Sequence, residues 1–247
     1  MDAVIGTAGW SIASTSAEEF PREGTALERY SAVFRSVEIN SSFHRPHRAS
    51  TWARWAEAVP DDFRFAVKLP KTISHQRKLA GCGDLLDQFI EESAGLGGKL
   101  ALLLLQLPPK LGFDSALAED FLGDLASRTT TRIACEPRNP SWFEPAADEL
   151  LARLGVSRVA ADPAVVPPAA EPGGWRGLDY WRLHGSPVIY RSAYGADRLE
   201  AYAEAVAAAL VKGREVWCMF DNTASSAATA DALALRKRLT ELSAPCR

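Results

Sequence analysis

The stretch from residue 132 to residue 162 reads RIACEPRNPSWFEPAADELLARLGVSRVAAD. It begins with a short β-like run at Arg132–Glu136 and passes through a polar loop into a helical pattern at Pro145–Leu154. Gly155 then stands where a helix C-cap favours glycine, and a second β-like run follows at Ser157–Asp162. A strand, a helix and a strand in this order are typical of a βαβ unit with two parallel strands.

The same alternation recurs on both sides of this stretch. The other β-like runs are Ala3–Thr7, Ser36–Asn40, Phe63–Lys68, Leu100–Gln106, Tyr180–His184 and Glu215–Asp221. The other helical patterns are Leu27–Phe34, Thr51–Ala58, Asp84–Ala94, Ser115–Ala126, Leu199–Val211 and Ala224–Leu242. Gly97–Gly98 and Gly213 also stand at expected helix C-caps. The sixth connection, Pro163 to Leu178, holds four prolines and no helical period, which predicts an irregular loop.

Eight β-like runs without a linker or a break in composition predict an α/β fold, a single (β/α)8 TIM barrel with a parallel eight-stranded sheet over residues 1–247. Two halves of a doubly wound sheet are the alternative. The length of 247 residues is typical of one α/β barrel domain. In such a barrel the active site lies at the C-terminal ends of the strands, on the loops that lead into the helices.

Composition limits the classes of protein that the chain can be. It is 47% hydrophobic and 24% charged with a net charge of −3, which is close to the globular average and excludes collagen-like and coiled-coil proteins. No apolar run approaches the roughly 20 residues of a membrane span, and the start MDAVIGTAGW lacks the pattern of a signal peptide. We therefore predict a cytoplasmic protein with no membrane partner. The cysteines, Cys82, Cys135, Cys218 and Cys246, form no CxxC and are predicted to be buried reduced thiols.

Polar side chains gather where the predicted strands end. Strand side chains alternate between two faces, and in a barrel one face meets the helices while the other points inward. The polar residues on the predicted inward face, or just beyond it, are Glu38, Asn40, Lys68, Gln106, Glu136, Arg138, Asp162, Arg182, His184 and Asp221. Because ionisable residues are rarely buried without partners, this pattern predicts a functional cleft.

Seven segments of the chain also match a known family. They are GTAGWS, VEINSSFHRP, FRFAVKLPKTISH, LLLQLPPKL, CEPRNPSWF, YWRLHGSP and MFDN. In family order and over about residues 5 to 235, they resemble the YecE-like family, domain of unknown function 72. The resemblance implies a TIM barrel without a settled activity. Its recurring positions fall on Gly9, Trp10, Glu38, Asn40, Lys68, His75, Gln106, Glu136, Arg138, Arg182, His184 and Asn222.

The chain departs from this family pattern at three positions. His44 replaces a common tyrosine, Ser74 a threonine and Asn139 a histidine. Asn139 weakens any mechanism that needs an imidazole beside Arg138.

Our leading hypothesis is an enzyme that uses acid–base chemistry on an anionic, phosphorylated ligand without an obligatory metal or other cofactor. Arginine binds phosphate or carboxylate bidentately, and lysine supplies a point charge. We assign Lys68, Arg138 and Arg182 to the anion. Catalytic roles fall to Glu136 and His184, with His75 as a second candidate imidazole and Glu38 orienting the ligand or the base. The other predicted ligand-binding residues are Trp10, Asn40, Gln106 and Asn222.

Three other hypotheses stay open. A divalent metal held by Glu38, Glu136, Asp162, His184 and Asp221 would make the chain a metal-dependent hydrolase or nuclease. A basic rim formed by Arg45, His47, Arg48, Lys71, His75, Arg77 and Lys78 would suit a non-catalytic barrel that binds nucleic acid or protein. A Schiff base on Lys68 would require desolvation, which the nearby carboxylates oppose.

Overall fold

The computed structural model describes residues 3–243. Its strands are β1 Val4–Thr7, β2 Ser36–Ile39, β3 Arg64–Lys68, β4 Leu100–Gln106, β5 Arg132–Glu136, β6 Val156–Arg158, β7 Ala160–Asp162, β8 Gly173–Gly174, β9 Leu178–Leu183 and β10 Glu215–Phe220. Its α-helices are α1 Ala26–Ser31, α2 Ser41–His44, α3 Ala49–Glu57, α4 Gly83–Ser93, α5 Ser115–Arg128, α6 Pro145–Arg153, α7 Ala196–Val211 and α8 Ala228–Ser243. Short 3-10 or π turns lie at Ser14–Glu19, Thr72–Gln76, Ala94–Lys99, Pro140–Phe143 and Pro167–Ala170.

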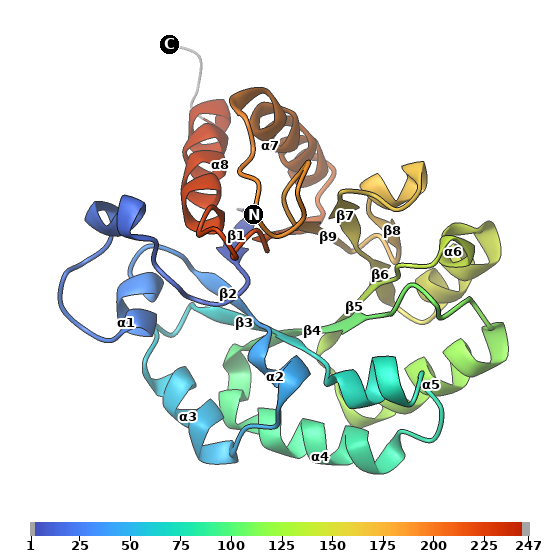
Figure 1. Ribbon diagram of the computed structural model, residues 1–247. Helices are drawn as coiled ribbons and strands as arrows, with labels where there is room; N and C mark the ends of the chain where they lie inside the picture. The colour runs from blue at the N-terminus through green and yellow to red at the C-terminus, as the bar shows by residue number, and fades with distance from the viewer. Residues whose placement is uncertain (1–2, 244–247) are drawn as a thin grey trace.

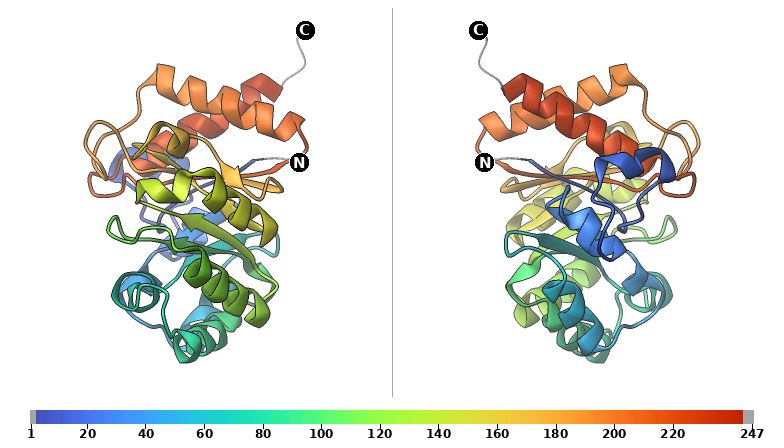
Figure 2. Two further views of the ribbon diagram at one scale, coloured as in Figure 1. Left: turned by 90° about the vertical axis from the view of Figure 1, so that its right-hand side faces the viewer. Right: turned by 90° about the vertical axis from the view of Figure 1, so that its left-hand side faces the viewer.

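The strands form two hydrogen-bonded sheets with helices around them. One sheet has the order β1-β10-β9-β7, and the other has the order β2-β3-β4-β5-β6-β8. All pairings are parallel except that of β8, which is antiparallel to β6. Figure 1 shows the strands at the centre, with α7 and α8 on one side of them and α3, α4 and α5 on the other. The side views in Figure 2 show the same layering.

The two sheets meet at two seams. At the first seam, β1 approaches β2 through an isolated bridge between Ala8 and Glu38. The two strands are so close here that a Cβ atom on Gly6 would lie 2.6 Å from the Ser36 carbonyl oxygen. At the second, the predicted sixth strand is broken at Val159, so that β6 pairs with β5 and β7 pairs with β9. The parallel α/β organisation is confirmed, whereas these ladders do not close into one eight-stranded ring.

The predicted helices are present, with shifted ends. The last one begins at Ala228 rather than Ala224, and α2 was not expected. The sixth connection contains no α-helix, as its prolines predicted, only a 3-10 turn and the two-residue β8. Gly155 and Gly213 have φ values of 69° and 74°, the positive φ expected after a helix, whereas Gly97 (φ 54°, ψ −138°) lies inside the Ala94–Lys99 turn.

The core has two layers. Alternate side chains of the strands pack outward against the helices, as Phe65, Leu103 and Cys135 do. The opposite side chains form a smaller inner group, for example Ala66, Leu104 and Tyr180. Cys82, Cys135 and Cys218 are buried free thiols, as predicted, and Cys246 lies outside the described residues.

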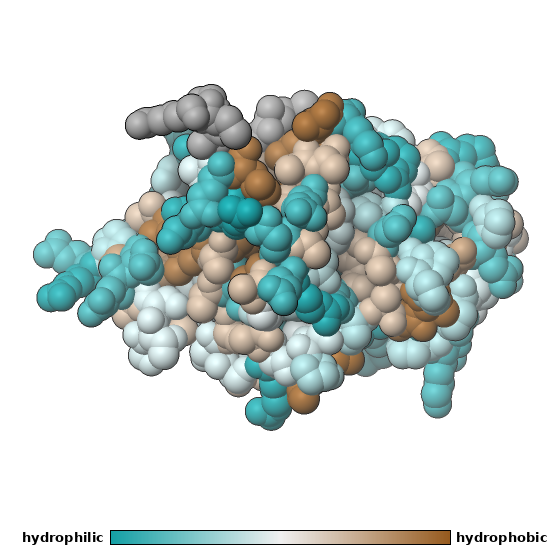
Figure 3. All heavy atoms as spheres, turned by 90° about the horizontal axis from the view of Figure 1, so that it is seen from above, coloured by the Kyte–Doolittle hydropathy of each residue, from teal (hydrophilic) through white to brown (hydrophobic). Residues whose placement is uncertain are grey.

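The molecular surface shows no apolar band on the side drawn in Figure 3, where hydrophobic side chains occur in small groups among hydrophilic ones. Within residues 3–243, no helix has both the length and the apolar character needed to cross a membrane.

Candidate functional site

Arg182 is the centre of a buried charged cluster. It comes from β9 and is 0% exposed. Its Nε and Nη2 donate to the two carboxylate oxygens of Glu38 at 3.0 and 2.6 Å, and Nη2 also donates to Asp221 Oδ2 at 3.0 Å. Its Nη1 donates to Glu136 Oε2. Every nitrogen of the guanidinium is therefore bonded to a carboxylate, so Arg182 is not free to bind the ligand to which the sequence assigned it.

Glu136, the last residue of β5, joins this cluster to the rim. Its carboxylate accepts hydrogen bonds from Gln106 Nε2 at 2.9 Å, from Arg138 Nη2 at 2.8 Å and from Arg182. Burial opposes its ionisation, but the Arg182, His184 and Arg138 charges hold the pKa of Glu136 well below its ordinary value. Glu136 is therefore a weak base that fixes the position of Arg138, whose side chain is 21% exposed.

His184 lies between two carboxylates. Its Nε2 is 2.9 Å from Glu136 Oε1, and its Nδ1 is 3.0 Å from Asp221 Oδ2. Burial alone would lower its pKa, but the Glu136 charge and the hydrogen bonds to Asp221 and Glu136 raise the pKa of His184 above its ordinary value. The imidazolium is thus part of the cluster, with both ring nitrogens already engaged.

Replacing His184 by glutamine is expected to destabilise the protein more at about pH 6 than at about pH 9. A group with a raised folded-state pKa stabilises fully below its unfolded pKa, and this contribution disappears as the pH rises through the folded value. Urea unfolding at both pH values measures the difference. His44→Gln, on an exposed residue of α2, serves as control. An equal loss at both pH values would contradict a charged His184.

Lys68, the last residue of β3, forms no ion pair with these carboxylates. The α2 helix is held against β3 because Ser42 Oγ donates to the Lys68 carbonyl oxygen at 2.6 Å. This places Phe43 so that Lys68 Nζ lies 4.1 Å from the centre of its ring. Lys68 is 7% exposed, and within the described residues its Nζ takes part in no ion pair or hydrogen bond. Burial, together with the Arg182 charge, lowers the pKa of Lys68 to about 8.

His75 lies beside Lys68 on a π turn, a local irregularity that is frequent at functional sites. Its ring meets Phe43 edge-on with centroids 5.0 Å apart, and its Nδ1 is 2.9 Å from Ser74 Oγ. Burial and the charges of Lys68 and Arg138 lower the pKa of His75, which favours a neutral imidazole.

Two further predicted residues flank the cluster. Gln106 is bonded to Glu136, as described above. The Oδ1 atom of Asn40 is buried and has no hydrogen-bond partner within the part of the chain that the structure describes. Unpaired buried acceptors of this kind are uncommon in folded proteins.

The structure separates Trp10 and Asn222 from this cluster. Trp10 packs edge-on against Trp55, with centroids 5.1 Å apart. Asn222 donates to the Ser192 carbonyl oxygen at 2.9 Å and to Asp231 at 2.6 Å. These contacts tie loops and α8 together rather than reaching the cluster.

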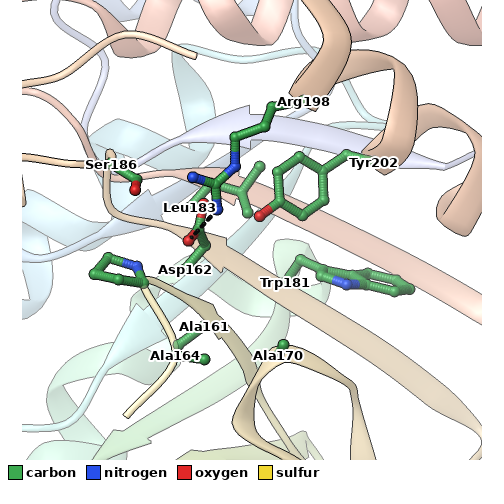
Figure 4. Close-up of a pocket in the computed structure, with 10 residues that line it drawn as sticks. Ala161, Asp162, Ala164, Ala170, Trp181, Leu183, Ser186, Arg198 and Tyr202 are labelled. Atoms are coloured by element: carbon green, nitrogen blue, oxygen red, sulfur yellow. Dashed lines mark hydrogen bonds and ion pairs between the residues drawn. The ribbon is translucent and has the colours of Figure 1, made fainter. Parts of the chain in front are cut away.

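Asp162 was predicted on the inward face, and this is wrong. Val156 and Ala160 pack in the outer core and Val159 in the inner one, so the alternation runs through the break at Val159 in the phase opposite to the expected one. Asp162 Oδ1 accepts from Arg198 Nη2 of α7 at 2.6 Å. Figure 4 shows this pair beside Tyr202, in a separate cavity of about 270 Å³ between β7, β9, α7 and the sixth connection.

The predicted metal ligands do not fit a metal ion. Glu38, Glu136 and Asp221 direct their oxygens to Arg182 and His184, and Asp162 faces Arg198. Over residues 3–243, no group of three or more His, Cys, Asp or Glu side chains is arranged to hold one.

Two tyrosines of the site were not assigned to it from the sequence. Tyr180 donates its hydroxyl to Glu38 Oε2 at 2.7 Å. Its place on the inward register of β9, two residues before Arg182, was the available signal. Tyr190 is 40% exposed, has a φ of 66° and meets the His184 ring edge-on with centroids 5.7 Å apart. Its position on the loop after β9 was the available signal.

Comparisons with known proteins identify the family. A family model described as "Protein of unknown function DUF72" matches residues 4–246. UPF0759 protein YecE of Escherichia coli (strain K12) is 34% identical over 144 residues, which cover 56% of this chain and 52% of YecE. The match thus spans about half of that relative's length.

Solved structures agree in fold. A DUF72 family protein from Enterococcus faecalis V583 has a TM-score of 0.83 at 22% identity, covering 97% of this chain and 96% of that chain. A xylose isomerase-like TIM barrel/4-hydroxyphenylpyruvate dioxygenase fusion protein has a TM-score of 0.52 at 14% identity, covering 100% of this chain and 45% of that chain. The fold is therefore TIM-barrel-like, and the chain belongs to the DUF72 family.

Proposed function

We propose that this chain is an enzyme that binds a small anionic ligand, of the phosphate or carboxylate class, at the C-terminal ends of its strands. The proposal treats the two sheets as one barrel, with Lys68 and Arg138 at its open end. The observation that carries it is the unpaired ammonium of Lys68. Nζ has no protein partner within the described residues. The atom is not fully enclosed, so a ligand can reach it.

The charges of the site support an anion. Glu38, Glu136 and Asp221 supply three negative charges, all engaged by Arg182 or His184. Arg182, Arg138, Lys68 and the protonated His184 supply the positive ones. One positive charge is left over, and we assign it to Lys68, which has no ion-pair partner within the described residues and follows a strand end as the partly exposed Arg138 does. An anion bound there gains charge-assisted hydrogen bonds from both residues.

The same geometry reassigns the proton-transfer roles. Glu136 and His184 are bonded to each other and to the cluster, so we assign them to positioning Arg138. His75 is the better general base because its lowered pKa favours the neutral ring. In the tautomer whose Nδ1–H donates to Ser74 Oγ, the lone pair of Nε2 accepts the proton.

Inorganic phosphate and pyrophosphate are expected to bind the wild-type protein and to raise its melting temperature. Lys68→Met and Arg138→Gln are each expected to weaken this binding by about tenfold, the loss of roughly one charge-assisted contact. Isothermal titration at about pH 7 measures the affinity. Lys110→Met, on an exposed loop residue after β4, is the matched control and should bind as the wild type does. Failure of both anions to bind the wild type would overturn the proposal.

A nucleic-acid surface is the second candidate function. Arg45, Arg48, Arg77 and Lys78 are exposed on the loops after β2 and β3, and none forms an ion pair within the described residues. Such unpaired basic groups favour contact with a phosphate backbone, with an affinity that falls as salt increases. Arg45→Ala combined with Arg77→Ala should reduce the binding of a single-stranded oligonucleotide and flatten its salt dependence. Binding unchanged in that variant would exclude this surface.

A further inference from the structure

The amine of Lys68 differs from that of another poorly exposed lysine of the chain. Lys99, whose side chain is 17% exposed, donates to the carbonyl oxygens of Ala56 and Val59, at 2.7 Å each. Lys68 is less exposed, and its Nζ rests on the face of Phe43 instead of on an acceptor. An amine held in this way, with its nitrogen open to a ligand, is placed as a nucleophile rather than as a structural ion pair.

The sequence suggested that nearby carboxylates would keep Lys68 charged and solvated. In the structure Arg182 and His184 engage those carboxylates, whose charges still favour the protonated amine but are outweighed by burial and the Arg182 charge. Arg182 opposes a second positive charge beside it, and burial acts in the same direction, so that the pKa of Lys68 falls to about 8. About a tenth of the protein therefore carries a neutral amine at pH 7, and about half at pH 8.

We propose that Lys68 forms a Schiff base with an aldehyde or ketone group of the anionic ligand. This inference rests on the proposed function, in which Arg138 binds the anionic part of the same molecule. It narrows the substrate class to carbonyl compounds that also carry a carboxylate or phosphate group. Lys68 then acts as a covalent nucleophile, and the anion contact falls mainly to Arg138.

The step balances without a further reactant. The lone pair of the neutral Nζ attacks the carbonyl carbon and forms a C–N bond, while the C=O π electrons move to oxygen. His75 accepts a proton from the nitrogen and returns it to the oxygen of the carbinolamine. One proton from solvent completes the departure of water as the C–O bond breaks, which leaves a protonated imine. Lys68 and His75 both contact Phe43, which keeps the two groups on one side of the site.

Reductive trapping tests the proposal on the whole chain. The wild type is incubated with pyruvate and sodium cyanoborohydride, and peptide mass mapping measures the adduct on every lysine. We expect Lys68 to be labelled at least about tenfold faster than the exposed Lys110, at a rate that increases as the pH rises toward about 8. Labelling of Lys68 no faster than that of Lys110 would overturn the Schiff base.

Two further arms separate this proposal from the anion site. Lys68→Arg should keep phosphate binding and lose the adduct at this position, because a guanidinium holds the charge but is not an amine nucleophile. Phosphate should slow the labelling of Lys68 by pyruvate. If the wild type binds phosphate but Lys68 is not labelled, the Schiff base fails and the anion site stands. If phosphate neither binds nor slows the labelling, the anion site fails and the nucleophilic amine stands.

Discussion

Replacing Arg182 by methionine is expected to lower the free energy of unfolding by about 3–5 kcal/mol. Methionine fills a similar volume but leaves Glu38, Glu136 and Asp221 buried without their shared counter-charge. Removing one partner of a buried ion pair is costly because the remaining charge has neither water nor a partner. The carboxylates would respond by binding protons, so the loss should be smaller at about pH 5 than at about pH 8.

Urea unfolding of the wild type and Arg182→Met at both pH values measures this effect. Arg153→Met is the matched control because Arg153 pairs with Glu119 on the surface, where both side chains are about half exposed. Exposed pairs contribute little, so the control should unfold at the midpoint of the wild type. A midpoint for Arg182→Met that also equals the wild-type value would contradict the central role given to Arg182.

Replacing Glu136 by glutamine is expected to move stability and anion affinity in opposite directions. The change keeps the shape but removes the charge that Arg182, Arg138 and His184 share, which should cost about 3 kcal/mol of unfolding free energy. It also removes a negative charge close to the anion site. Phosphate should then bind more tightly, by roughly tenfold if unit charges lie about 12 Å apart in a medium of effective dielectric constant about 20, and by more at shorter distances.

Titration calorimetry with phosphate at about pH 6.5, at a temperature where the variant is folded, measures the second effect. Glu119→Gln, on the surface, should change neither the midpoint nor the affinity. Weaker phosphate binding in Glu136→Gln would show that the positioning of Arg138 by Glu136 outweighs the repulsion between Glu136 and the anion, and would contradict the expected gain in affinity.

Most of the fold could be predicted because the strands and helices have different periods. The alternation in β2, β3, β5 and β9 correctly separated the side chains that face the helices from those that face inward. The prediction failed at residues 156–162, where small residues replace large apolar ones. A run such as VAAD has no strong difference between its two faces, so the break at Val159 and the outward turn of Asp162 could not be predicted from it.

The sequence predicted which residues meet at the site better than it predicted the role of each residue. Glu38, Lys68, Gln106, Glu136, Arg182 and His184 meet at the strand ends because they share one register. Their pairing depends on which side chain is long enough to cross the interior, and register does not specify this. Arg182 forms ion pairs with three carboxylates, which engage all of its nitrogens, whereas Lys68 has no ion-pair partner within the described residues. The role of each basic residue depends on which of them pairs with the buried carboxylates, and the sequence pattern does not predict this pairing.

The pKa of Lys68 in solution tests whether this residue is a buried amine that is free to bind the anion. Nuclear magnetic resonance of the labelled lysine side chains, assigned with Lys68→Arg, follows the titration with and without phosphate. We expect the Lys68 amine to have a pKa of about 8 in the free protein. We also expect an increase of about one unit or more with phosphate, because an anion favours the protonated amine. A free-state pKa near the ordinary lysine value of about 10.4, unmoved by phosphate, would contradict it.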